Sequence, residues 1–234
     1  MPIDSTTLII LVLSGLIGPA LLIWLWRDQK RRQAALHDMA ARRGWQIMIT
    51  LSQLGAPERT VLRPQTETRG DWELTSRRQH NDGAGISEVA STDYTRPEPR
   101  WPEGLLVIGP PLPPEAAAMA GTMLAMMQGP MGEAVLAKLI GPGLAHQASH
   151  LRLLPEVAGA TAFASHDPAD RADPARVAAQ LATWQSLKSG EIGRPILILG
   201  PDGMRLRLRH QLKTPAQIEA FIDFGATLAD VLRA

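Results

Sequence analysis

The sequence predicts an α+β fold, with one N-terminal transmembrane helix followed by a cytoplasmic α/β sandwich-like domain whose sheet is mixed or antiparallel. Three observations carry this prediction. Residues 7–26 contain no charged side chain, residues 45–112 hold short apolar runs separated by turn residues, and residues 153–234 alternate strand and helix patterns. The predicted segments are therefore 1–6, 7–26, 27–44, 45–112, 113–152 and 153–234.

Residues 7–26 form the predicted membrane span, because about 20 apolar residues in a helix cross a hydrocarbon core of about 30 Å. Residues 1–6 contain no Lys or Arg, so the positive-inside rule predicts an extracytoplasmic N-terminus and a cytoplasmic C-terminal domain at a bacterial inner membrane. A cleaved signal peptide would instead carry its basic residues before the apolar stretch. The residues predicted to lie at the membrane interface are Trp24, Trp26, Arg27, Lys30, Arg31 and Arg32.

A small-residue patch interrupts the span at Ser14, Gly15, Gly18 and Pro19. Ser14 and Gly18 are four residues apart, the spacing that lets two membrane helices approach closely. We therefore expect an integral membrane protein as a partner of the span.

The basic segment 27–44 continues the helix to Gly44, a residue typical of helix ends. Its charges fit a solvated stalk that sets topology. They also fit attraction to anionic lipid, at about 1 kcal/mol for each basic residue near the surface.

The segment 45–112 is predicted to be rich in β-strands. In the stretch 71–77, Trp72 and Leu74 are expected to face the core, whereas Asp71, Glu73 and Thr75 face water. The sequence HNDGAG at 80–85 is typical of a hairpin loop. The predicted strands are 45–51, 59–63, 71–77, 86–92 and 104–109.

The segment 113–152 is rich in Ala and Met and predicts helices at about 114–128 and 131–140. Its methionines belong either to a core or to an adaptable docking surface for a partner, since Met repacks easily. The candidate partner surface consists of Met119, Met123, Met126, Met127 and Met131.

The C-terminal segment predicts a strand at 161–166, a helix that starts after Asp173 and ends near Gly190, a hairpin at 194–211 and a last helix. Thr214 and Gln217 have the spacing of a capping box. The helices are expected to cover one face of the sheet. The buried stripe predicted for the last helix is Ile218, Phe221, Ile222, Gly225 and Leu228.

Composition and motifs exclude several function classes. The chain has 24 Lys and Arg against 23 Asp and Glu, so we expect no nucleic-acid partner. The absence of cysteine excludes disulfides and thiolate metal sites. Phosphate loops, nucleophile elbows and kinase motifs are missing, and no cofactor is expected.

Three patterns are candidate sites. His146 and His150 have metal-ligand spacing but lack a third ligand nearby, and the Asp-Pro pairs around Asp173 fit turns and a helix cap. Arg205, Arg207 and Arg209 alternate with leucines along a predicted strand. This candidate basic ladder is either a solvated outer face of the sheet or a surface for anionic lipid or an acidic partner.

The patterns ATAFASHDPADR, PILILGPDGMRLRLR and AQIEAFIDFGATLADVL, together with MAARRGWQI and WPEGLLVIG, resemble those of uncharacterised bacterial single-pass membrane proteins with a cytoplasmic α/β domain. The resemblance implies no particular activity. We therefore expect a non-catalytic membrane-anchored accessory or scaffold subunit, docked on a larger and possibly energy-converting inner-membrane complex. The alternatives are a membrane-tethered lipid- or ligand-binding sensor domain and, third, an unrecognised hydrolase or metalloenzyme.

Overall fold

The computed structural model describes most of the chain, and the statements below concern that part. The described residues are 5–50, 58–66, 71–78, 80–81, 87–88, 90–117, 119, 122, 150–155, 157, 159–168, 171–184 and 193–233, without the side chains of 5–20, 22, 25, 80, 81, 87 and 88.

An α+β fold with a nine-stranded sheet is observed, and every strand pair in the sheet is antiparallel. A separate two-stranded hairpin consists of β4 (His80–Asn81) and β5 (Ser87–Glu88), as the loop motif at 80–85 predicts. In spatial order the large sheet runs β1 (Trp45–Thr50), β2 (Arg59–Pro64), β3 (Glu73–Arg77), β6 (Ser91–Arg96), β11 (Gly203–Leu208), β10 (Ile196–Gly200), β7 (Leu106–Gly109), β9 (Thr161–Ala164) and β8 (Arg152–Leu153).

The C-terminal hairpin β10–β11 lies in the middle of the sheet, between β6 and β7. The two segments predicted as a β-rich lobe and a C-terminal α/β lobe therefore share one sheet. The stretch 86–92, predicted as one strand, holds β5 and the first residues of β6, which occupies Ser91–Arg96 and pairs with both β3 and β11. The sequence STDYTR has little apolar character, so its strand depends on these long-range partners.

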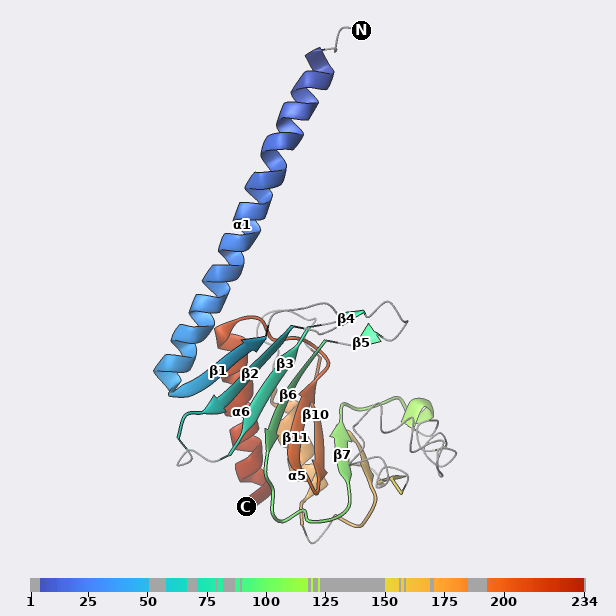
Figure 1. Cartoon of the computed structure of the whole chain (residues 1–234). Helices are drawn as coiled ribbons and strands as arrows, with labels where there is room; N and C mark the ends of the chain where they lie inside the picture. Colours follow the sequence, from blue (N-terminus) through green and yellow to red (C-terminus); the bar gives the residue numbers. More distant parts are fainter. Residues whose placement is uncertain are drawn as a thin grey trace.

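One face of the sheet, here called the inner face, is covered by α5 (Pro174–Ala182) and α6 (Pro215–Arg233), as predicted (Figure 1). Register places one row of side chains straight across this face, from β1 to β9. All but the half-buried first member are buried, and they form the core with the helices. The row is Ile47, Leu62, Leu74, Tyr94, Leu206, Leu197, Ile108 and Ala162.

The helix ends follow local sequence rules. Asp173 caps α5 by accepting hydrogen bonds from the amides of Ala175 and Arg176, and Pro174 occupies the first helical position. The helix ends at Ala182 instead of near Gly190. At this end the amide of Thr183 donates to the carbonyl of Gln180, three residues back, at 3.0 Å, which closes the last turn. Residues 185–192 lie outside the described part.

The predicted capping box of α6 is confirmed: the Gln217 amide donates to Thr214 Oγ1, and the Thr214 amide donates to Gln217 Oε1, both at 3.3 Å. The predicted stripe of α6 is confirmed as well, since every member is buried. Gly225 in this stripe faces the ring of Tyr94, and a Cβ atom there would lie 2.6 Å from it. The glycine thus lets α6 approach the sheet closely at its most buried aromatic residue.

The helix α1 (Ser5–Arg43) is continuous from the predicted span into the predicted stalk and projects far beyond the domain (Figure 1). Its last turns pack on the domain, with Met39 and Ala40 fully buried. Arg43 forms ion pairs with Glu219 at 3.2 Å and Asp223 at 2.7 Å, both on α6. These hydrogen bonds raise the pKa of Arg43. Gly44, with φ of 67°, then turns the chain directly into β1.

Among the described residues, no helix is long and apolar enough to cross a membrane. Most side chains of the predicted span 7–26 lie outside the described part, including those of Ser14, Gly15, Gly18 and Pro19.

Substitution of Gly225 by Ala is expected to lower the free energy of unfolding by about 1–3 kcal/mol, because the added methyl group overpacks the contact with Tyr94. Helix propensity alone would predict stabilisation of about 1 kcal/mol. Urea unfolding of the detergent-solubilised chain measures the difference. Gly193→Ala is the matched control, since nothing lies within 4 Å of its Cβ position. A Gly225→Ala protein as stable as wild type would contradict the close-approach explanation.

Candidate functional site

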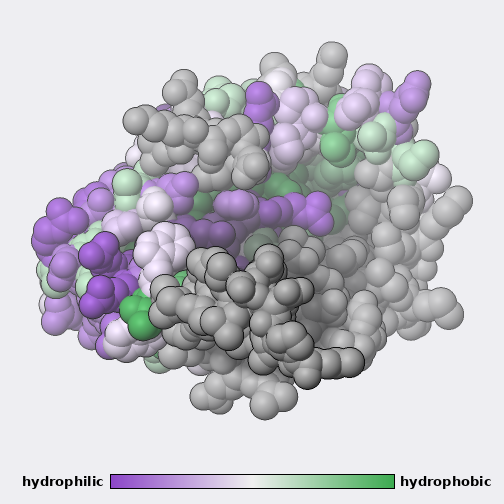
Figure 2. Space-filling model, turned by 90° about the horizontal axis from the view of Figure 1, so that it is seen from above, coloured by the Kyte–Doolittle hydropathy of each residue, from purple (hydrophilic) through white to green (hydrophobic). Residues whose placement is uncertain are grey.

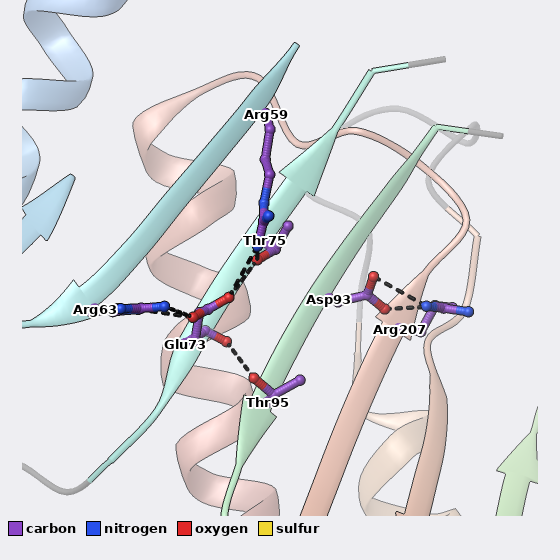
Figure 3. A network of polar contacts seen from close by, with 7 residues as sticks. All are labelled: Arg59, Arg63, Glu73, Thr75, Asp93, Thr95 and Arg207. Atoms are coloured by element: carbon purple, nitrogen blue, oxygen red, sulfur yellow. Dashed lines mark hydrogen bonds and ion pairs between the residues drawn. The ribbon is translucent and has the colours of Figure 1, made fainter. Parts of the chain in front are cut away.

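The face of the sheet opposite the inner face, here called the outer face, carries a network of charged and polar side chains from neighbouring strands (Figure 3). Glu73 on β3 is its centre. Its carboxylate accepts hydrogen bonds from Arg63 Nε and Thr75 Oγ1, both at 2.8 Å, and lies 3.5 Å from Arg59 Nη2. Thr95 on β6 donates to the backbone carbonyl of Glu73 at 3.2 Å.

The network holds Glu73 in its ionised form. Partial burial acts to raise the pKa of this carboxyl group, but the hydrogen bonds from Thr75 and Arg63 and the charges of Arg63 and Arg59 outweigh it. The net result is a pKa below the ordinary value. The sequence predicts that Glu73 and Thr75 both face water. Glu73 is partly exposed, whereas Thr75 is buried.

Asp93 and Arg207 form the second pair of the outer face. They are directly opposite each other on β6 and β11, and Arg207 Nε and Nη2 bind the two carboxylate oxygens at 2.6 and 3.2 Å. Such two-point pairs are among the stronger charge-assisted hydrogen bonds. Asp93 is buried, so this contact also compensates the desolvation of its charge.

The candidate basic ladder is therefore split by the structure. Arg205 and Arg207 share the outer face of β11 while Leu206 and Leu208 face the core, as the alternation predicts. Arg207, however, is engaged by Asp93, and Arg209 follows the end of the strand. The three arginines do not present one continuous row of available charge.

Basic residues gather instead at one end of the sheet. By register, Arg77 at the end of β3 lies beside the start of β6, and the end of β11 lies beside Thr92. Thr92 Oγ1 donates to the carbonyl of His210 and accepts from the amide of Leu212, so it pins the following loop to this end. We call this surface the basic end; it comprises Arg31, Arg32, Arg77, Arg78, Arg209, His210 and Lys213.

The basic end faces along α1 toward the predicted span (Figure 1). Figure 2 views the molecule from that side, and hydrophilic residues form a patch at the left and a band across the middle. Two of the basic residues have acidic partners, since Arg32 pairs with Asp28 at 2.7 Å and Arg78 with Glu58 at 3.6 Å.

A cleft of about 460 Å³ lies at the basic end, between α1 and the loop that precedes α6. One wall is α1, and the other is the stretch from His210 to Gln217. Within the described residues, neither Arg31 nor Lys213 forms an ion pair with an acidic side chain. The lining residues are Arg31, Arg32, Ala35, His210, Gln211, Lys213, Thr214, Pro215 and Gln217.

The residues predicted for the membrane interface lie on α1 above this cleft. Trp24 and Trp26 are 65% and 57% exposed, although both are large and apolar. The ammonium group of Lys30 lies 3.9 Å from the centre of the Trp26 ring, which is a cation–π contact. Leu21 and Ile23 are exposed in the same way, so nothing described in this chain covers the end of the predicted span.

A second cleft, of about 610 Å³, lies at the opposite end of the sheet, beside the start of α5. Ser165 Oγ there lies 2.9 Å from His166 Nδ1 and accepts the amide hydrogen of Leu105 at 2.8 Å. Asp173 is used as the cap of α5, as its sequence context predicts. These contacts serve the ends of β9 and α5.

The other sequence candidates are only partly described. His150 is exposed, His146 lies outside the described residues, and no cluster of three metal-ligating side chains occurs in the described part. Met119 is 65% exposed and follows a helical start at 114–117. The other members of the candidate partner surface lie outside the described residues, and this surface stays a prediction: Met123, Met126, Met127 and Met131.

Comparison with protein-family models, with curated proteins and with solved structures finds no match. The resemblance to bacterial single-pass membrane proteins therefore stays a prediction.

Sequence reasoning missed the partners of the charges. Asp93 and Arg207 are 114 residues apart in the chain, and Arg31 and Lys213 line one cleft only because the end of α1 packs on the domain beside α6. The alternation of Arg and Leu in β11 was a usable signal for the outer face, but the acidic partner on β6 has no local signature.

Substitution of Glu73 by Gln is expected to remove an acid-sensitive contribution to stability. The folded pKa of Glu73 lies below its unfolded value of about 4.3, so the ionised carboxylate stabilises the fold above that pH. This stabilisation disappears as the pH falls through the folded pKa. The difference in Tm between wild type and Glu73→Gln should thus be largest above about pH 5 and shrink in more acidic buffer. Equal differences at all pH values would contradict the role of the carboxylate.

Replacing Arg207 by Met is expected to cost about 2–3 kcal/mol, because it leaves the Asp93 carboxylate buried without its partner. Adding Asp93→Asn to this variant should recover part of the loss. Urea unfolding of the four proteins of this cycle gives the coupling energy. Arg209→Met, at an exposed position after the strand, is the control and should change stability by about 0.5 kcal/mol or less. Additive losses would show that the pair is not coupled.

Proposed function

We propose that this chain is a non-catalytic accessory or scaffold subunit of an inner membrane. In this proposal residues 7–26 cross the bilayer, and the α+β domain lies on the cytoplasmic side, where it docks onto a larger membrane complex. The observation that carries the proposal is the exposed apolar end of the predicted span, at Leu21, Ile23, Trp24 and Trp26. Exposed apolar surface of this kind marks contact with a membrane or a partner.

The change from apolar to basic residues along α1 supports a membrane as the main contact. Trp26 is followed directly by Arg27 and, four residues later, by Lys30, the order found where a helix leaves the hydrocarbon for the cytoplasm. A soluble helix with so many exposed large apolar side chains would be an aggregation hazard.

The attachment of α1 to the domain supports an accessory role. Met39 and Ala40 are buried and Arg43 is bound to α6, so the anchor and the domain are joined without a flexible linker. A domain held in this way presents one fixed side to the bilayer, which suits docking beside another membrane protein.

A second candidate function is a membrane-tethered sensor that binds lipid or another anionic ligand. The basic end and its cleft favour this alternative. Both functions require the same anchor, so the anchor is the property to test first.

Two arginines placed in the span, Leu13→Arg and Ile17→Arg, are expected to release the full chain from the membrane. Each arginine costs about 2.5–3.5 kcal/mol at the centre of a membrane helix. Carbonate extraction of membranes measures the release, and the control variant carries Ala34→Arg and Ala41→Arg at exposed positions of α1. Retention of the span variant in carbonate-washed membranes would contradict the proposed anchor. Mild-detergent purification of wild type and span variant, followed by mass spectrometry, then asks whether a membrane partner is lost with the anchor.

A further inference from the structure

We propose that the cleft between α1 and the loop before α6 binds the phosphate of an anionic phospholipid in the same bilayer that anchors the chain. The inference rests on the proposed membrane anchor and assigns it a lipid class and a binding site. In this proposal Arg31 and Lys213 contact the phosphate, and Arg32 and His210 lie beside them in the cleft.

The chemistry of the cleft fits a phosphate group. Arginine and lysine are the side chains that bind phosphate oxygens most strongly, and here they approach from two elements far apart in the sequence. Two acidic side chains described at this end already have basic partners, since Asp28 pairs with Arg32 and Glu58 with Arg78. No carboxylate lines the cleft, so an anion entering it meets no repulsion from the lining.

The position of the cleft selects a lipid over other phosphates. Arg31 follows Trp26 by five positions on a continuous helix, which is about 8 Å along the axis. The polar layer of each leaflet is about 5–8 Å thick. With Trp26 at the edge of the hydrocarbon, Arg31 therefore lies at the outer edge of the headgroup layer, and its long side chain, which points back toward the N-terminus of the helix, can reach the phosphates.

The rest of the basic end supports this orientation. Arg77, Arg78 and Arg209 lie at the same end of the sheet and add positive charge toward the same surface. An anionic leaflet attracts such residues by about 1 kcal/mol each, which corresponds to roughly a fivefold change in binding. The opposite end of the sheet carries the second cleft, whose lining includes Asp167 and Asp173.

The test uses the full chain in nanodiscs of phosphatidylcholine alone or mixed with phosphatidylglycerol. Acetylation of Lys213, followed by mass spectrometry, is expected to be several times slower in the mixed discs. Native mass spectrometry of protein released from the mixed discs is expected to show phosphatidylglycerol enriched over the bulk ratio. The double variant Arg31→Gln and Lys213→Gln should lower this enrichment roughly fivefold for each residue removed.

The matched control is Arg152→Gln with Arg176→Gln, two exposed arginines at the other end of the sheet that remove the same charge. It should retain phosphatidylglycerol as wild type does. Equal retention by the cleft variant, or equal acetylation of Lys213 in both kinds of disc, would overturn the proposal. Protection of Lys213 by inorganic phosphate in phosphatidylcholine discs, to the extent seen with phosphatidylglycerol, would also overturn it in favour of a soluble phosphate. If carbonate removes the wild-type chain from membranes, the anchor proposal itself is wrong. That result is obtained before any lipid is compared, so the two failures are distinguishable.

Discussion

The contact on which the rest of the structure depends is the packing of the last turns of α1 against α6 and β1. Met39 and Ala40 are buried there, Arg43 binds two carboxylates of α6, and a single glycine separates the helix from the first strand. A helix joined in this way cannot swing as it would on a flexible linker. The preceding turns of the same helix form one wall of the basic cleft, so the cleft exists only while α1 is docked.

The charges of the domain divide into two groups with different roles. On the outer face, Glu73 and Asp93 each lie against arginines on neighbouring strands, and these contacts compensate buried or half-buried carboxylates. The role of these ion pairs is to stabilise the folded sheet. At the basic end, positive side chains from α1, β3 and the loop after β11 converge with few acids among them, so their field extends outward. A near-neutral total charge conceals this division, because it averages over the whole chain.

Local patterns predicted the parts of this fold that local physics determines. The cap at Asp173, the capping box at Thr214, the stripe of α6 and the alternation in β11 all follow from neighbouring residues. The prediction covers only the first residues of β6, because STDYTR has little apolar character and one of the two strands beside it, β11, is distant in sequence. The union of two predicted lobes into one sheet, and the placement of Arg31 and Lys213 around one cleft, likewise depend on topology that no short stretch of sequence contains.

The central position of the β10–β11 hairpin has a consequence for how the protein is made. The strands β1, β2, β3 and β6 leave the ribosome early, but the free edge of β6 waits for β11, which is encoded near the end of the chain. The proposed anchor would already be in the membrane by then. Pairings of such long range form slowly and leave a strand edge open meanwhile. The edge of β6 that pairs with β11 in the finished sheet therefore stays without its native partner until Gly203–Leu208 has been synthesised.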